Sequence, residues 1–336
     1  MKKIHKLEYD YLQTAYCGGK ARGEPYSDLA LEAAEVLAQK MRQPQPPGVE
    51  NVVEQTDEGT ITRVRVKDPT AGRQLDKLPG TYITFESPRL RERDRDYQEN
   101  VSRLLGKELH GLLGLPGEET QKTVLVVGLG NWNATPDALG PRVVSKILVT
   151  RHLIQNLGDE AYPGLRPVCV FAPGVLGITG METGEIVQGV VQKIKPDLVI
   201  VVDALASKSS QRVAAAIQMA DTGIHPGAGI GNKRFGLTRE TLGVPVFAIG
   251  VPTVVEALTI VGDALDRLAE KGRVQNPGGY KQNILQQVLQ PFLGSMVVTP
   301  KEIDVLIEDL GRVVANTINI GLHPQVDPAE FLRYTQ

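Results

Sequence analysis

The stretch TVLVVGLGNWNATPDALGP, residues 123–141, decides the predicted fold of this 336-residue chain. It opens with the apolar run Thr123–Val127, which is typical of a strand buried on both faces of a parallel sheet. The run ends in the turn GLGN at 128–131, and Pro136 then suits the first turn of a helix, where its missing N–H has no partner. Asp137 therefore follows a strand, at the sheet edge where open α/β sheets bind their ligands.

The same period continues on the carboxyl side of this stretch. Further strands are predicted at 168–171, 198–202 and 244–249, and helices at 179–194 and 253–271. Two capping-box patterns, at 179–182 and 299–302, are expected to begin the helix at 179 and a final helix that reaches about 317. The alternation predicts an α/β fold, with a mostly parallel sheet and helices on both faces.

The flanking regions differ in character from this core. Residues 1–28 are polar, 29–41 are rich in helix formers, and the proline-rich QPQPPG at 43–48 ends that helix. A hairpin is predicted where 51–55 and 60–66 flank the turn at 57–59, followed by a strand at 81–87 and a helix at 89–113. We expect four regions: an arm of 1–28, a smaller β-containing region of 29–118, an α/β core of 119–271 and a C-terminal helical region of 272–336.

Charge and composition narrow the function classes. The formal net charge is −2, so no basic field indicates nucleic acid or an anionic membrane as a direct partner. The N-terminus has no apolar signal core, and no run reaches the roughly 18 apolar residues that span a bilayer. The two cysteines, Cys17 and Cys169, form no framework, which suits a reducing compartment. The prediction is a soluble, cytoplasmic protein.

Two aspartates follow predicted strands. Asp137 follows the strand at 123–127, and Asp203 directly follows LVIVV at 198–202. Carboxyl ends of parallel strands meet at one edge, and two close carboxyls share a proton because both cannot comfortably be charged. Such a pair supplies an acid and a base for attack of water on an amide. The commoner role of an aspartate at a strand end is a helix cap or an ion pair.

Two glycine-rich loops resemble nucleotide-binding loops, but the spacing of their glycines does not match those motifs. DTGIHPGAGIGNKR at 221–234 lacks the order of a phosphate-binding loop, and GLG at 128–130 lacks the third glycine of the dinucleotide fingerprint. Tight turns, or a flap that covers a substrate, are favoured. The five histidines show no metal-ligand spacing, so neither a metal nor a cofactor is predicted. A nucleotide-binding module remains an alternative.

Five long motifs stand out in the core: GLGNWNATPDALGP at 128–141, TRHL at 150–153, KPDLVIVVDALAS at 195–207, the loop at 221–234 and TLGVPVFAIGVPTVV at 241–255. Together they resemble the germination proteases of endospore-forming bacteria. The resemblance covers most of 120–260 and a patch near 26–33. It implies an atypical aspartic-type endopeptidase, made as a zymogen, that degrades small acid-soluble spore proteins as a homotetramer in the future spore core. The family's two proposed catalytic aspartates fall on Asp137 and Asp203.

A more distant resemblance links the chain to hydrogenase maturation endopeptidases. Their Gly-x-Gly-Asn…Asp-x-x-Gly element is similar to residues 128–140. In those enzymes, the matching carboxylates engage a metal that the substrate protein already holds. A metal-checking maturation endopeptidase is therefore one alternative function, and a non-catalytic binding protein of the spore is another.

The resemblance also implies a maturation site. The family's substrates have an acidic residue before the cut, then a large apolar residue, an alanine, a variable residue and a glutamate. The segment DLALE at 28–32 has this order, which predicts cleavage between Asp28 and Leu29. The alternative is a simple helix start capped by Ser27 or Asp28. Because the residue before the cut is acidic, Lys233 and Arg234 are predicted to bind it, and His225 is predicted as a further substrate-binding residue.

Overall fold

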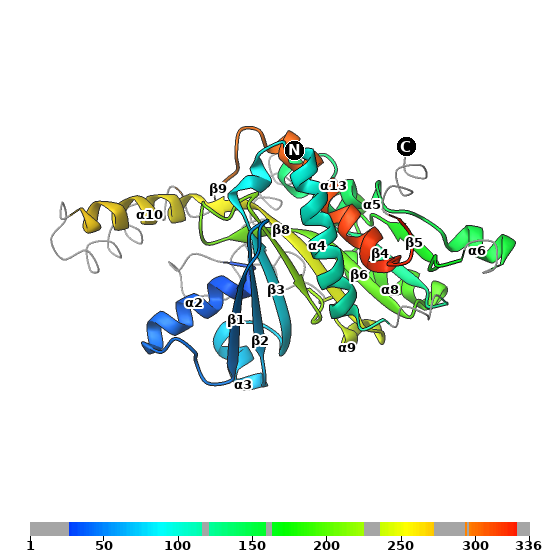
Figure 1. Cartoon of the computed structure of the whole chain (residues 1–336), viewed down its shortest axis with the longest axis horizontal. Helices are drawn as coiled ribbons and strands as arrows, with labels where there is room; N and C mark the ends of the chain where they lie inside the picture. The colour runs from blue at the N-terminus through cyan, green and yellow to red at the C-terminus, as the bar shows by residue number, and fades with distance from the viewer. Residues whose placement is uncertain are drawn as a thin grey trace, which may run out of the picture.

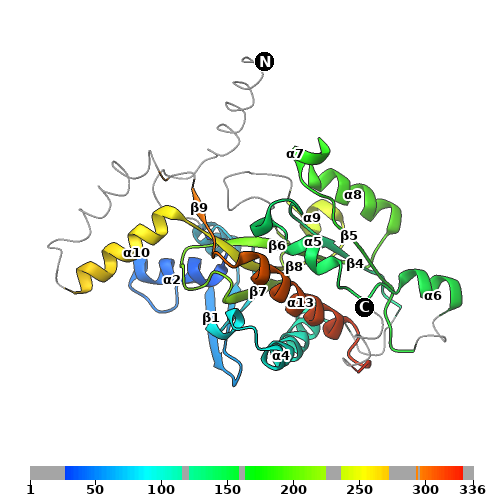
Figure 2. The same ribbon diagram turned by 90° about the horizontal axis from the view of Figure 1, so that it is seen from above.

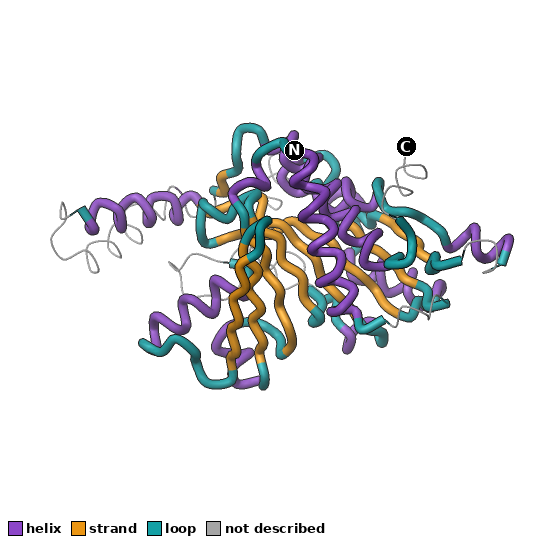
Figure 3. Tube along the Cα trace, viewed as in Figure 1, coloured by secondary structure: helices purple, strands orange, loops and turns teal. Residues whose placement is uncertain are grey.

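The computed structural model describes residues 27–115, 121–158, 163–224, 236–271, 293 and 296–327. Within these ranges, the strands form one sheet with the order β1-β2-β3-β7-β8-β6-β4-β5, and β9 pairs with β8 (Figure 1). The sheet is continuous behind the helices in Figure 3. The predicted α/β class is confirmed.

The sheet has a parallel half and an antiparallel half. The parallel half is β4 (Val124–Gly128), β5 (Val168–Phe171), β6 (Leu198–Ser207) and β8 (Val246–Glu256). The antiparallel half is β1 (Val49–Gln55), β2 (Thr60–Val66), β3 (Gly80–Glu86) and β7 (Ala216–Ala220), and β9 (Val297–Val298) is antiparallel to β8. The N-terminal hairpin thus extends the core sheet, because β3 pairs with β7.

Helices cover both faces of the parallel half, as predicted. Alternate residues of β4 point to opposite faces, so Val124 and Val126 enter one core while Leu125 and Val127 enter another. The first core lies under α4 (Arg95–Leu113), α5 (Leu139–Val144) and α13 (Ile303–Leu322). The second lies under α8 (Thr183–Ile194) and α9 (Arg239–Leu242). Figure 2 shows α4 and α13 on the opposite side of the sheet from α8.

The antiparallel half has its own helical cover. Helix α2 (Ala30–Met41) and α3 (Pro69–Leu75) pack on Val64, Val66 and Tyr82. The remaining helical elements are η1 (Pro88–Arg91), η2 (Thr135–Asp137), α6 (Arg151–Leu157), α7 (Leu176–Thr179) and α10 (Ala257–Glu270). Helix α10 extends away from the sheet in Figures 1 and 2. No helix of the described ranges is long and apolar enough to cross a membrane.

Several predicted boundaries are wrong. Strands β6 and β8 run beyond 202 and 249, because they pair with each other past the end of β4. Strand β7 was not predicted. The helix expected from 179 is broken at Gly180, and α8 begins at Thr183 without a side-chain cap. Helix α13 also lacks its predicted capping box, since the hydroxyl of Thr299 donates to the carbonyl of Thr253 instead.

Candidate active site

Three glycines allow the loop after β4 to fold onto itself. Gly130 has φ +115°, and a Cβ there would lie 1.9 Å from the carbonyl oxygen of Asp137. A Cβ on Gly128 would lie 2.2 Å from the carbonyl oxygen of Gly140, and one on Gly140 would lie 2.2 Å from that of Leu129. Only glycine fits such contacts between backbones. Backbone packing therefore accounts for the glycines of this loop.

This packing fixes Asp137, which ends the short helix η2. The backbone N–H of Asn131 donates both to the carboxylate Oδ2 of Asp137, at 2.9 Å, and to its carbonyl oxygen, at 3.0 Å. Asp137 is half-buried. The carboxylate is thus held by the loop's own backbone and keeps access to solvent.

Asp203 lies inside β6 rather than after it. The last residue of β4, Gly128, pairs with Val202, so Asp203 is the first residue of β6 beyond the end of β4. It pairs on its other side with Gly250 of β8, its side chain is only 8% exposed, and its Oδ1 accepts the N–H of Ala204 at 2.9 Å. The end of β4 creates the position where Asp203 meets the glycine loop.

The pKa of Asp203 is raised well above its ordinary value. Burial is the largest cause, and the negative charges of Asp137 and then of Asp28 add to it. These three carboxyl groups therefore share one electrostatic environment. The raised pKa shifts Asp203 towards its protonated form.

The N-terminal segment reaches this site through Asp28. Its N–H donates to the carbonyl of Ala206 at 2.9 Å, and its Oδ2 accepts the N–H of Ala206 at 2.8 Å. Gln218 of β7 holds the next peptide groups: its Nε2 donates to the carbonyl of Asp28 at 3.3 Å, and its Oε1 accepts the N–H of Ala30 at 2.7 Å. Leu29, between them, is fully buried.

Glu32 anchors the same segment a few residues later. It is 2% exposed, and its carboxylate accepts the backbone N–H of Lys208 at 2.6 Å, Nη1 of Arg212 at 3.3 Å and the hydroxyl of Ser27. Burial raises the pKa of Glu32, although these three bonds oppose the rise. The pKa of Arg212 is lowered by burial but raised on balance, because it also binds Glu35 and Glu86.

The structure corrects or leaves open the other predicted site residues. Leu29 takes the N-cap position of α2 and no side chain caps the helix, so the interpretation of Ser27 or Asp28 as a cap is wrong. His225, Lys233 and Arg234 lie outside the described residues. Sequence reasoning missed Gln218 and Arg212; a glutamine within the apolar strand AIQMA was a usable signal for Gln218, whereas Arg212 had none.

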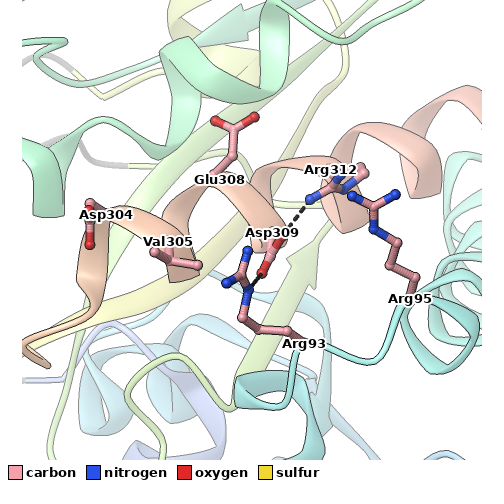
Figure 4. A pocket seen from close by; sticks show the side chains of 7 residues that line it. All are labelled: Arg93, Arg95, Asp304, Val305, Glu308, Asp309 and Arg312. Atoms are coloured by element: carbon pink, nitrogen blue, oxygen red, sulfur yellow. Dashed lines mark hydrogen bonds and ion pairs between the residues drawn. The ribbon is translucent and has the colours of Figure 1, made fainter.

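A separate surface cavity of about 590 Å³ contains none of these carboxyl groups. Two of its arginines flank one aspartate: Figure 4 shows Asp309 between Arg93 and Arg312, and the Arg93 Nε lies 3.4 Å from Asp309 Oδ2. Within the described ranges, no group of three or more His, Cys, Asp or Glu side chains is arranged to hold a metal ion. The cavity is lined by Arg93, Arg95, Asp304, Val305, Glu308, Asp309 and Arg312.

Comparison with known proteins places the chain in a family. The family model described as Germination protease matches residues 30–274 and 272–335. The chain belongs to the germination protease family. A germination protease of Clostridium acetobutylicum is 43% identical over 321 residues, 92% of this chain and 98% of that protein. One from Caldanaerobacter subterraneus is 46% identical over 322 residues, 90% of this chain and 96% of that protein.

A germination protease of Bacillus cereus is 41% identical over 356 aligned positions, covering 92% of this chain and 96% of that protein. Among solved structures, the [NiFe] hydrogenase maturation protease HycI of Thermococcus kodakarensis matches 63% of this chain and 98% of its own, with 16% identity and a TM-score of 0.31. These matches confirm the family that the motifs predicted. The name germination protease describes a peptidase.

Proposed function

We propose that this chain is an aspartic-type endopeptidase that begins the degradation of small acid-soluble spore proteins in the cytoplasmic compartment of the germinating spore. The observation that carries the proposal is the buried Asp203, whose ionisation Asp137 opposes, in a member of the germination protease family. A carboxyl pair that shares one proton is the arrangement by which aspartic proteases hydrolyse amides with water.

The two aspartates divide the chemistry between them. The protonated Asp203 donates a hydrogen bond to the scissile carbonyl and stabilises the negative charge that develops on its oxygen. Asp137 accepts a proton from the attacking water, whose oxygen bonds to the carbonyl carbon. When the C–N bond breaks, Asp137 returns that proton to the leaving nitrogen. Its bond from the N–H of Asn131 holds it ready for both steps.

The direct test compares wild type, Asp137→Asn and Asp203→Asn on a purified small acid-soluble spore protein. Each substitution should reduce cleavage at least about a thousandfold, because an amide at 137 cannot take the proton from water and an amide at 203 is a weaker hydrogen-bond donor than a carboxylic acid. Asp197→Asn is the matched control: Asp197 precedes β6 at its opposite end, where its Oδ2 accepts the N–H of Thr123 at 2.7 Å. Near-normal cleavage by either dyad variant rejects the mechanism.

We also propose that the chain is a zymogen cleaved between Asp28 and Leu29. The contacts of Asp28 with Ala206 and its effect on Asp203 support this site, since they bring the residue before the bond to the aspartates. Leu29 is fully buried, so the segment must shift slightly for water to reach the bond. N-terminal sequencing of active protein should begin at Leu29, and an intact Met1 would contradict the proposal.

Assembly as a homotetramer completes the proposal. Exposed apolar side chains on strand β1 and near β9 support a surface that is covered by other copies; they include Val52 and Val53, each 58% exposed, and Met296 and Val297. Light scattering after size exclusion should give four times the chain mass of 36.5 kDa. A monomer at micromolar concentration would contradict it.

A further inference from the structure

We propose that Arg212 and the backbone N–H of Lys208 form a subsite for the carboxylate of the fourth residue after the cleaved bond. Glu32 occupies it in the full-length chain, and a glutamate of the substrate protein occupies it during proteolysis. The inference rests on the proposed function, which supplies the bond that is cut. It adds the residues that read one position of the substrate.

The environment of Glu32 is that of a bound ligand rather than of a surface ion pair. Both of its carboxylate oxygens accept hydrogen bonds, and its side chain is 2% exposed, against 43% for Glu35, which binds the same guanidinium from the next turn of α2. Burying a carboxylate is costly unless donors surround it. The donors at Lys208 and Arg212 form such a pocket, and charge-assisted bonds of this kind discriminate strongly against a neutral side chain.

The spacing links this pocket to the cleaved bond. Asp28 binds Ala206, and Glu32 binds Lys208, so the two acids that bracket the segment contact the same strand end. Between them, Leu29 and Ala30 are fully buried, and the N–H of Ala30 is held by Gln218. The binding positions of the residue before the bond and of the fourth residue after it therefore lie a fixed distance apart.

Arg212 has one anchor outside α2, although its Nη1 and Nη2 also donate to Glu35 of that helix, at 2.8 and 2.7 Å. Its Nε donates to Glu86 of β3 at 2.6 Å, and its side chain is 17% exposed. The guanidinium is thus fixed on the sheet when residues 29–32 leave, and its Nη1 then faces the place of the Glu32 carboxylate. A substrate enters only after the new terminus has withdrawn, because Leu29–Glu32 fill the same positions.

The first experiment measures kcat/KM of the matured protein on two peptides that differ only in Glu or Gln at the fourth position after the cut. Wild type should prefer the Glu peptide by about ten- to a hundredfold, as expected for a charged hydrogen-bonding partner. Arg212→Met should reduce that ratio to about threefold or less while it still cleaves the Gln peptide. The control is Arg63→Met on strand β2. It loses comparable bonds, to Glu54 of β1 and Glu108 of α4, and should keep the wild-type ratio.

An unchanged ratio in Arg212→Met overturns the inference, whereas a wild type that cleaves neither peptide rejects the proposed function itself.

The second experiment uses the full chain and follows cleavage of its own 28–29 bond, so that it does not depend on the stability of Arg212→Met. Glu32→Gln should slow this cleavage about tenfold or more, because the pocket binds a charge. Glu35→Gln is the comparison that loses an ion pair with the same arginine, and it should mature faster than Glu32→Gln. Equal rates for wild type and Glu32→Gln overturn the inference, because a purely structural anchor would not promote the cut.

Discussion

The glycine loop of Asp137 and the strand of Asp203 place two identical side chains in opposite environments. Asp137 is half-buried on a short helical turn, and the backbone N–H of Asn131 binds its carboxylate. Asp203 is 8% exposed within a continuous strand and accepts one N–H bond from its neighbour Ala204. The strand disfavours a charge on Asp203, because burial raises its pKa. The fold, rather than the residue type, therefore sets the properties of this carboxyl group.

The largest expected effect tests the loop. Gly130→Ala places a Cβ 1.9 Å from the carbonyl of Asp137 at φ +115°, so the loop has to open and move its carboxylate. We expect a loss of about 2–4 kcal/mol in the free energy of unfolding, together with loss of proteolysis. Urea titration and cleavage assays measure both.

Gly180→Ala is the matched control for that substitution. Gly180 also has positive φ, +70°, but a Cβ there meets nothing within 4 Å. It should therefore cost only about 1 kcal/mol and leave cleavage intact. Equal effects of the two substitutions would mean that the backbone contact with Asp137 is not what holds the loop.

The strand is tested by the pH dependence of stability. Because the pKa of Asp203 is raised in the folded state, the folded chain binds more protons than the unfolded chain above about pH 4, and stability falls as pH rises through that range. Asp203→Asn removes this loss. The free energy of unfolding of Asp203→Asn should match that of wild type below about pH 4. At pH 8 it should be higher by about 1–3 kcal/mol, which is the typical cost of burying a polar group without a hydrogen-bond partner.

Denaturant titrations at a series of pH values measure this difference. Asp197→Asn, at the opposite end of β6, should follow the wild-type curve. A constant offset between Asp203→Asn and wild type at every pH would show that the side chain does not change its protonation on folding.

Elements controlled by local pattern could be predicted from the sequence. The buried strand at 124–128, the hairpin around 57–59 and the position of Asp137 after an apolar run follow from periodicity and turn chemistry. Features that depend on distant partners could not be predicted. The length of β6 depends on β8, and the role of Arg212 depends on glutamates from α2 and β3 that lie far away in the chain. Asp28 was chosen by resemblance, and its electrostatic effect on Asp203 links residues far apart in the chain, which no periodicity encodes.

The smallest effect is expected for Asn131→Ala, which alters the loop of Asp137 and leaves the strand of Asp203 unchanged. The side-chain Oδ1 of Asn131 accepts the N–H of Asn133 at 2.9 Å, while its own N–H holds Asp137. Asn131→Ala removes only the first bond, so stability should fall by about 0.5–1.5 kcal/mol, and kcat should fall severalfold as the loop loosens. Asn133→Ala, whose N–H remains, is the control. The fall in stability with rising pH that Asp203 causes should persist in Asn131→Ala, because the strand is untouched; a flattened pH profile would show that the two regions are one coupled unit.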